Sequence, residues 1–364
     1  MGAASYKNFQ LCATRSFAPQ YFCCSTPMNS IKPSQPQLIP VIVGPTCSGK
    51  SDLGIAIARH FGGEIINLDS VQVYRGLYVA TAKVPLEEQQ GIPHHFIDVV
   101  EPTENYTAGR YAVDAARCLA EIEARHQMAI FVGGTGFYLN ALRGRLFSEE
   151  EATDLTLRER LKSILTRRGP EHLHRMLMRL DPVSANRLAP RDWSRVTRAL
   201  EFFFQNGKRL SEQQPNLPDP PEFAARMRII VLNPPREVLY DKINRRVDVM
   251  EQNGLLAEIK NLLAAGVPHD AKAFGAHGYR RIIEFLRGER TYESAIEQMK
   301  TDTRHYAKRQ ITWWRREPDA AWFQGFGADP EIQQAVISYL EGSGFGKDEQ
   351  DQRDINSKTL NPEP

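Results

Sequence analysis

Short apolar runs that stop at glycine-rich turns constrain the fold of this 364-residue chain more than any other feature. Each run is short and mostly apolar, as is typical of strands buried on both faces of a sheet. The runs are residues 38–43, 64–68, 128–132 and 227–232. Helical stretches lie between them, at residues 50–60 and 110–126. Because strands that alternate with helices form a parallel sheet covered by helices, the sequence predicts an α/β core.

Residues 146–225 interrupt this pattern. They are helix-rich and loaded with Arg, and they end in a Pro-rich stretch at residues 214–221. We therefore predict a helical insertion at 146–225 that divides the core into a first part, residues 38–145, and a second part, residues 226–340. Because residues 44–51 fit the P-loop pattern G-x-x-x-x-G-K-[ST], we predict that the whole chain is a P-loop NTPase-like parallel sheet core with an inserted helical domain.

The two ends of the chain have a different composition. Residues 1–37 contain no Asp or Glu and only Lys7, Arg15 and Lys32 as basic residues, which is typical of a disordered extension or of an organellar targeting peptide. Residues 341–364 are rich in Gly, Asp, Gln and Asn, and we expect a disordered tail. A cytoplasmic location is the expectation, with organellar targeting by residues 1–37 as the alternative.

The overall composition excludes several classes of protein. Lys and Arg number 46 against 44 acidic residues, so the net charge of +2 says almost nothing about partners, and only the distribution of the charges can indicate them. No apolar run approaches the length of a transmembrane helix, and we expect no membrane partner. The five cysteines lack metal-ligand spacing, which indicates neither a zinc site nor a disulfide framework. We expect a monomer.

Residues 44–51 carry the strongest motif in the chain. They read Gly44, Pro45, Thr46, Cys47, Ser48, Gly49, Lys50 and Ser51, which fits G-x-x-x-x-G-K-[ST] between a predicted strand and a predicted helix. Such a loop wraps its N–H groups around phosphate oxygens, while the lysine adds a positive charge and the terminal hydroxyl can bind Mg²⁺. The motif predicts a polyphosphate site with Mg²⁺ as cofactor, and a flexible turn is the alternative.

Two further groups follow predicted strands. Asp69 comes directly after the run 64–68, and the turn Gly133-Gly-Thr-Gly136 follows the run 128–132, with Thr135 in its centre. Since the carboxyl ends of parallel strands share one crevice, Asp69 and Thr135 should face the same ligand as Lys50. Asp69 could hold a metal or act as a general base, and its structural alternative is an Asx turn or helix cap. For the glycines the alternative is a tight turn.

Other motifs point toward packing and toward a polyanion. In Pro93-His-His-Phe-Ile-Asp98 the adjacent histidines face opposite sides of an extended segment, so they do not define a metal site. Residues 306–316 interleave Lys and Arg with aromatic side chains, and Arg195 and Arg198 share one helix face. These basic surfaces favour a polyanionic partner, although a solvated charged face is the alternative.

Taken together, ordered blocks of this chain resemble tRNA dimethylallyltransferases. The blocks are GPTCSGKS at 44–51, DSVQVYRGL at 69–77, TAK at 81–83, PHHFID at 93–98, VGGTGFYL at 132–139, RVTRALE at 195–201 and YAKRQITWW at 306–314. Members of that family transfer an isopentenyl group from dimethylallyl diphosphate to N6 of the adenine that follows the anticodon. The similarity is colinear over about residues 40–325.

The resemblance implies a role for each matching residue. The loop 44–51 would hold the diphosphate, with Arg309 as a further diphosphate contact and Ser51 as a Mg²⁺ ligand. Asp69 would take the proton from N6, and Thr135 would lie near the scissile bond. The tRNA anticodon stem-loop would contact Asp69, Ser70, Val71, Gln72 and the segment Ser194, Arg195, Val196, Thr197 and Arg198. Cys47, where the family more often has Ala, and Ser51, where it has Thr, are minor departures.

Three other functions remain open. A P-loop small-molecule kinase would use the same loop on ATP, but it leaves the GGTG turn and the basic segments unexplained. An adenylate isopentenyltransferase would act on free nucleotides and would need no long basic insertion. A nucleic-acid-binding module with a regulatory P-loop would bind tRNA without altering it.

Overall fold

A computed structural model of the chain describes residues 38–146, 154–213 and 219–344. The predicted extension at 1–37 and the end of the predicted tail, from residue 345, lie outside the described residues. The strands are β1 (Ile39–Val43), β2 (Gly63–Leu68), β3 (His94–His95), β4 (Met128–Gly133), β5 (Met227–Leu232) and β6 (Ala321–Phe323).

The helices follow the strands in alternation and then extend the second half of the chain. They are α1 (Lys50–Phe61), α2 (Ala108–Ala124), α3 (Gly136–Leu142), α4 (Leu155–Arg168), α5 (Pro170–Leu180), α6 (Pro182–Arg187), α7 (Trp193–Asn206), α8 (Leu210–Gln213), α9 (Arg236–Gln252), α10 (Leu255–Ala264), α11 (His277–Leu286), α12 (Tyr292–Trp314) and α13 (Pro330–Gly344). Short 3₁₀ turns occupy Glu222–Arg226 and Lys272–Gly275. None of the helices in the described ranges is both long and apolar enough to cross a bilayer.

The strands form one six-stranded sheet in the order β3-β2-β4-β1-β5-β6, and every pairing is parallel. This confirms the predicted α/β core. The order reverses direction at β1, which pairs with β4 on one side and with β5 on the other. Ligands of open parallel sheets bind at such a switch point, beyond the carboxyl ends of the strands. The loops after β1 and β4 leave the sheet there side by side.

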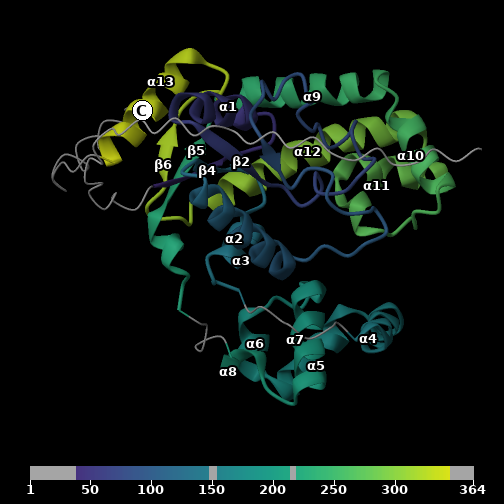
Figure 1. Ribbon diagram of the computed structural model, residues 1–364. Helices are drawn as coiled ribbons and strands as arrows, with labels where there is room; N and C mark the ends of the chain where they lie inside the picture. The colour runs from purple at the N-terminus through teal and green to yellow at the C-terminus, as the bar shows by residue number, and fades with distance from the viewer. Residues whose placement is uncertain (1–37, 147–153, 214–218, 345–364) are drawn as a thin grey trace, which may run out of the picture. The chain divides into compact units, whose positions relative to one another are not determined.

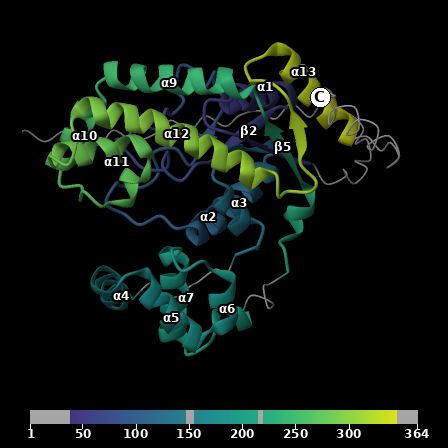
Figure 2. The same ribbon diagram turned by 180° about the vertical axis from the view of Figure 1, so that it is seen from behind.

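Both faces of the sheet are covered, as the apolar strands require. Helices α1 and α13 pack on one face, where Ile42, Ile65 and Ile230 meet Leu53 and Val336 in one buried cluster (Figure 1). Helices α2 and α3 pack on the other face over a second cluster (Figure 2). Because successive side chains of a strand point to opposite faces, a strand with helices on both sides must be apolar throughout.

Helices α4 to α8, within the predicted insertion, have an apolar cluster of their own. Its fully buried members include Leu173, Leu177, Val196 and Leu200. A buried carboxylate, Asp181, ties α6 to α8 by accepting hydrogen bonds from the N–H and hydroxyl groups of two serines, Ser184 and Ser211. The first of these helices begins at residue 155, and the sheet resumes at residue 227.

Three elements were not predicted as separate secondary structure. β3 has two residues and β6 has three, which is too short for a periodic pattern to show. Helix α13 continues to Gly344, so residues 341–344 are helical where the sequence predicted the start of the disordered tail. The helix is held there by Val336, Ile337 and Leu340, which pack against the sheet.

Two glycines of the 133–136 turn lie directly against α12. A Cβ built on Gly134 would come within 2.1 Å of Gln310 Nε2, and one on Gly136 within 2.0 Å of Trp313 Nε1. Gln310 uses this closeness: its amide donates to Gly134 O and its carbonyl oxygen accepts from the N–H of Thr46. Close packing against α12 therefore requires glycine at positions 134 and 136, and Gln310 links the turn 133–136 to the loop 44–51.

We expect Gly136→Ala to destabilise the protein by about 1–3 kcal/mol, because the added methyl group has no space beside Trp313. Gly342→Ala is the matched control, since a Cβ there meets nothing within 4 Å and helix α13 favours Ala. Thermal or urea unfolding of both variants provides the measurement. Equal stabilities of the two variants would contradict the close packing.

Candidate functional site

A cavity of about 440 Å³ opens at the carboxyl edge of the sheet, between the loops after β1, β2 and β4. The cavity is lined by residues from eight separate parts of the chain. They are Thr46–Asp52 (46–52), Ile65, Asn67, Asp69, Gln72, Thr81, Ala82, Val84, His94, Ile97, Val132, Gly133, Gly134, Lys242, Arg246, Tyr306, Gln310, Phe326 and Ala328. The volume is within the usual range for small-molecule sites.

The loop 44–51 has the backbone of a phosphate cradle. Gly44, Cys47 and Gly49 have φ values of 148°, 64° and 80°, and these positive angles turn the chain around an open centre. Gly49 also packs on the backbone of Gly327, whose N–H donates to Ser48 O. Helix α1 begins at Lys50, so the N–H groups of its first turn have no acceptor within the helix. An anion is the natural partner of such an end.

Lys50 reaches across its own loop. Its Nζ donates to Pro45 O at 2.7 Å, and burial lowers the pKa of its ammonium group to about 8. Ser48 is fully buried beside it, and its Oγ has no hydrogen-bond partner among the described residues. A lone buried hydroxyl is costly, and a phosphate oxygen in the cavity would satisfy it.

Helix α9 contributes two cations that sequence reasoning missed. Arg246 donates from Nη1 to Thr46 Oγ1 at 3.3 Å and also contacts Cys47 Sγ. Lys242 lies one helical turn earlier, with its Nζ 3.7 Å from the centre of the Phe326 ring. Both line the cavity opposite Lys50. Their spacing of four residues on one helix was the only available signal, because nothing local links α9 to a loop 200 residues away.

Asp69 is both an Asx turn and a cavity residue. Its Oδ1 accepts hydrogen bonds from the N–H groups of Val71 and Gln72, at 2.8 and 3.2 Å. The structural alternative and the location at the ligand-facing edge therefore hold together. The turn fixes one carboxylate oxygen and so orients the other, which makes the group rigid.

Thr135 supports the turn that carries Asp69. Its Oγ1 accepts from the N–H of Ser70 at 3.2 Å, and its side chain also hydrogen-bonds with Tyr306. Thr135 does not itself line the cavity, where the same turn is represented by Gly133 and Gly134. The structure thus brings Thr135 next to Asp69 but leaves the cavity wall to the glycine backbone.

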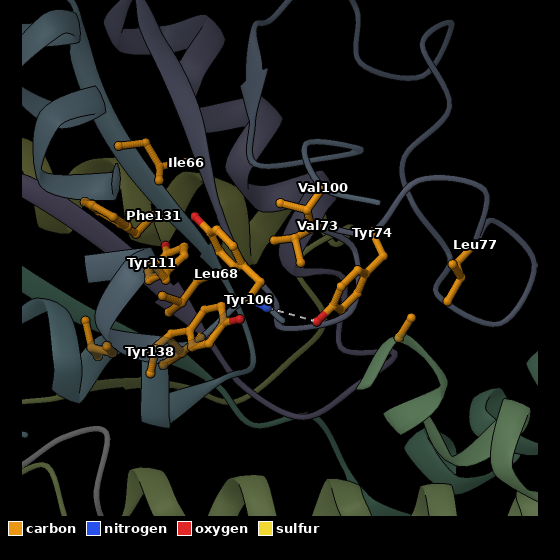
Figure 3. Close-up of a cluster of buried hydrophobic side chains, with 14 of the residues drawn as sticks. Ile66, Leu68, Val73, Tyr74, Leu77, Val100, Tyr106, Tyr111, Phe131 and Tyr138 are labelled. Atoms are coloured by element: carbon orange, nitrogen blue, oxygen red, sulfur yellow. Dashed lines mark hydrogen bonds between the residues drawn. The ribbon is translucent and has the colours of Figure 1, made fainter. Parts of the chain in front are cut away.

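Residues 70–77, which follow Asp69, are anchored by side chains that are buried in the core. Val73, Tyr74 and Leu77 are buried in the cluster that also holds Tyr106 and Tyr138, as Figure 3 shows. The Tyr74 hydroxyl accepts a long hydrogen bond, 3.5 Å, from the N–H of Tyr106. These buried side chains hold residues 70–77 against the sheet, so the position of Asp69 follows from core packing.

The motifs TAK and PHHFID lock this segment from the side. Lys83 is buried and donates to Asp98 Oδ1 at 2.5 Å and to Tyr74 O. The N–H of Asp98 donates to Gln72 O, and Gln72 Nε2 returns to Thr81 O at 3.0 Å. Burial lowers the pKa of Lys83, and the adjacent Asp98 carboxylate opposes that shift. Both motifs therefore hold Gln72 in place, one through Asp98 and the other through Thr81.

A second cavity of about 200 Å³ lies on the other side of Asp69. It shares five residues with the first cavity: Thr46, Asp69, Thr81, Arg246 and Tyr306. Ser70 and Val71 line only the second cavity, together with residues of α9, α11 and α12. A carboxylate thus stands between two chambers, and each chamber could hold one of two reactants.

The remaining candidate residues lie away from both cavities. Arg309 is exposed on α12, 5.8 Å from the Tyr306 ring, and lines neither chamber. On α7, Arg195 pairs with Asp192 and Arg198 with Glu201. Ser194 is exposed and Thr197 is partly buried. Val196 is fully buried in the core of α4–α7, so its side chain serves packing.

The donor set suits a hard cation only in combination with a phosphate. No cluster of three or more His, Cys, Asp or Glu side chains lies among the residues that the structure describes. Ser51 and Asp52 are the oxygen-bearing side chains at the end of the loop that line the cavity. Mg²⁺ keeps several waters and uses few protein ligands when it binds with a phosphate, so these residues fit it.

Residues 72–317 match the family described as IPP transferase. The chain belongs to the IPP transferase family. The tRNA dimethylallyltransferases of Solibacter usitatus and Koribacter versatilis are 45% and 44% identical to it, over 81% and 84% of this chain and 95% and 99% of theirs.

Solved structures of the family have the same fold. The full-length tRNA isopentenylpyrophosphate transferase of Bacillus halodurans is 34% identical, with a TM-score of 0.63 over 85% of this chain and 97% of that one. A eukaryotic dimethylallyltransferase captured acting on tRNA is 30% identical, with a TM-score of 0.68 over 84% of this chain and 78% of that one.

The lowered pKa of Lys50 predicts a pH dependence of phosphate binding. The cationic form holds the anion, and it gives way to the neutral amine as the pH rises through about 8. The affinity for an alkyl diphosphate, whose phosphates are fully ionised in this range, should fall by about tenfold for each pH unit above 8.

Calorimetric titration from pH 7 to pH 9.5 measures this affinity. Lys50→Arg is the matched control, because a guanidinium group keeps its charge throughout the range and should give a flat profile. A flat profile for the unaltered protein would show that Lys50 does not supply the charge.

Proposed function

We propose that this chain is a tRNA dimethylallyltransferase. It transfers a dimethylallyl group from dimethylallyl diphosphate to N6 of adenosine 37 in tRNAs that read codons beginning with U, giving N6-dimethylallyladenosine and diphosphate. The observation that carries the proposal is the position of Asp69, which lines both a phosphate-type cavity and a second chamber. Membership of the IPP transferase family supports it.

In this proposal the donor diphosphate lies in the loop 44–51. Lys50, Arg246 and Lys242 surround it, and the Ser48 hydroxyl donates to a diphosphate oxygen, which gives it the partner that it otherwise lacks among the described residues. Charge that develops on the leaving oxygen is then stabilised by groups already in place, which is the most effective form of electrostatic catalysis. Arg309 was predicted as a further diphosphate contact, but it lines neither chamber, so we propose for it a contact with the incoming tRNA phosphates instead.

Asp69 is the general base. An exocyclic adenine amine is a weak nucleophile, so a carboxylate that accepts its proton assists attack on the allylic carbon. The N6–C1 bond forms, the C1–O bond breaks, and the electron pair leaves with diphosphate. Since Oδ1 is held by the turn, Oδ2 is the oxygen oriented to receive the proton.

Mg²⁺ is the proposed cofactor, held by Ser51 and by diphosphate oxygens. When bound, it neutralises charge on the leaving group. Asp52, the neighbour of Ser51 in the cavity wall, would accept hydrogen bonds from water molecules around the ion.

The tRNA is the second substrate. The adenine must leave its stack to enter a chamber beside Asp69, and contacts elsewhere on the anticodon arm offset that cost. Ser70, Val71 and Gln72 follow Asp69 in the wall between the chambers and would contact the base. The start of α7, with Ser194, Arg195, Thr197 and Arg198, would contact the RNA backbone. We further propose a monomer in the cytoplasm.

The open alternatives predict other behaviour. A kinase would place ATP across the first chamber and would have no use for a carboxylate facing a second one. An adenylate isopentenyltransferase would modify free AMP. A binding module would release tRNA unchanged.

Incubation with undermodified tRNA, labelled dimethylallyl diphosphate and Mg²⁺, followed by nucleoside analysis, tests the proposal directly. Labelled N6-dimethylallyladenosine in the tRNA is the expected product. Two controls test the alternatives. In one, AMP replaces tRNA as the acceptor; in the other, ATP replaces dimethylallyl diphosphate as the donor. Label transferred only to free AMP, or phosphate transferred from ATP, would replace the proposal with one of the alternatives.

Asp69→Asn should lower single-turnover prenylation by about 10² to 10⁴, because the amide keeps the size of the side chain but cannot accept the proton. Binding of donor and tRNA should remain. Thermal unfolding is measured in parallel, since the amide oxygen can still accept the turn hydrogen bonds. A variant that loses stability but keeps its turnover per folded molecule would identify Asp69 as a structural residue only.

Arg195→Ala should weaken tRNA binding and reduce the slope of log affinity against log salt by about one, the effect of a single lost phosphate contact. Asp192→Asn is the matched control, because the amide oxygen can still cap α7 while the charge that pairs with Arg195 is removed, and this variant should strengthen binding. Filter binding across a salt series measures both. Identical slopes for all three proteins would exclude Arg195 from the interface.

A further inference from the structure

Part of the wall of the first cavity is apolar, which the phosphate cradle does not explain. This apolar wall is formed by Ile65, Val84, Ile97 and Val132. Ile65 and Val132 belong to the apolar cluster beneath α1, so this wall is part of the core. An allylic diphosphate bound through its phosphates would place its short hydrocarbon tail against these side chains.

A polar side chain, His94, lines the same cavity beside this apolar wall. It lies on the edge strand β3, opposite Ile65 in the register of β2, so the two side chains share one face of the sheet. Its Nδ1 is 2.8 Å from Ile92 O, and because a carbonyl can only accept, Nδ1 is the nitrogen that carries the proton. Nε2 is then a bare acceptor.

No partner for this acceptor exists among the residues that the structure describes. His94 Nε2 is buried and makes no hydrogen bond, although His94 lines the cavity. Burial lowers the pKa of His94, which keeps the ring neutral and the lone pair available. An unmatched buried acceptor is destabilising, so a donor from outside the chain is the expected partner.

The neighbouring histidine shows that this situation is specific to His94. His95 points to the other side of the strand and pairs with Glu64 at 2.7 Å, while Arg125 holds the same carboxylate. His95 is therefore a satisfied structural residue. The two histidines therefore differ in their hydrogen bonding. His95 Nε2 has a partner in Glu64, whereas His94 Nε2 faces the cavity without one in the described part of the chain.

We propose that His94 recognises a hydroxyl group on the terminal carbon of the prenyl donor, so that this chain accepts a hydroxylated allylic diphosphate at least as well as the plain one. The inference rests on the proposed function and extends its donor class. The hydroxyl donates to Nε2, and the rest of the tail lies on the apolar wall. The chemistry is unchanged: the N6–C1 bond forms, the C1–O bond breaks, the electron pair leaves with diphosphate, and the N6 proton goes to Asp69. The hydroxyl group takes no part in the reaction and remains on the product.

Two substitutions separate the nitrogens of the ring. His94→Asn places an amide where Nδ1 lies, so it keeps the donation to Ile92 O and removes the acceptor at Nε2. His94→Gln extends an amide to the position of Nε2, where its carbonyl oxygen can accept from the hydroxyl. Thermal unfolding first establishes that both variants are folded.

The experiment compares dimethylallyl diphosphate with (E)-4-hydroxy-3-methylbut-2-enyl diphosphate on each protein. The readouts are kcat/KM for tRNA prenylation and calorimetric affinity in the absence of tRNA. For each readout, the value for the hydroxylated donor is divided by the value for the plain donor. This ratio of kcat/KM values, and the ratio of affinities, should fall by roughly tenfold in His94→Asn, the effect of one neutral hydrogen bond, and should recover in His94→Gln.

Each outcome decides one of the two proposals. If the ratios of kcat/KM and of affinity are equal in the unaltered protein and in His94→Asn, Nε2 accepts a hydrogen bond only from water and not from the donor hydroxyl. This outcome would overturn the inference. If neither donor gives prenylated tRNA, the proposed function fails, but a His94-dependent difference in affinity would still support the donor class. Plain donor turned over with the hydroxylated donor rejected would retain the function and exclude the inference.

Discussion

The parallel order of the sheet is the constraint on which the rest of the structure depends. Because β1 lies between β4 and β5, the loops that follow β1 and β4 leave the same edge at adjacent positions. The loop after β2 joins them and carries Asp69. A strand order that moved β2 away from β4 and β1 would separate the loop 44–51 from Asp69. The chemistry proposed for the site is thus a consequence of topology before it is a consequence of any single side chain.

Helix α12 converts this arrangement into a fixed geometry. One amide, that of Gln310, hydrogen-bonds to both glycine-rich turns, and Tyr306 lines both chambers beside Asp69. The glycines at 134 and 136 allow the helix to lie this close. A site composed of loops would otherwise be mobile, whereas here each loop is supported by a rigid element or by buried side chains.

The sequence was sufficient for the features that are local. The strands, the loop 44–51 and the position of Asp69 depend on neighbouring residues, and the pattern shows them directly. Lys242 and Arg246 were missed because their role depends on how α9 packs against a distant loop. Arg309 was chosen from a motif, but a motif does not tell which face of α12 meets the cavity. The strands β3 and β6 are too short to carry a pattern, and only tertiary pairing defines them.

The chain leaves the core after α3 and returns before β5 at nearly the same point, since a Cβ on Gly144 would lie 3.3 Å from Pro221 and 3.6 Å from Pro220. A segment whose ends meet imposes little on the domain that carries it, because a short turn spans the same gap. The helices between these residues are in effect a cassette. Natural variation can lengthen, exchange or reshape that cassette while the sheet keeps its register, so the inserted helices and the sheet can change separately.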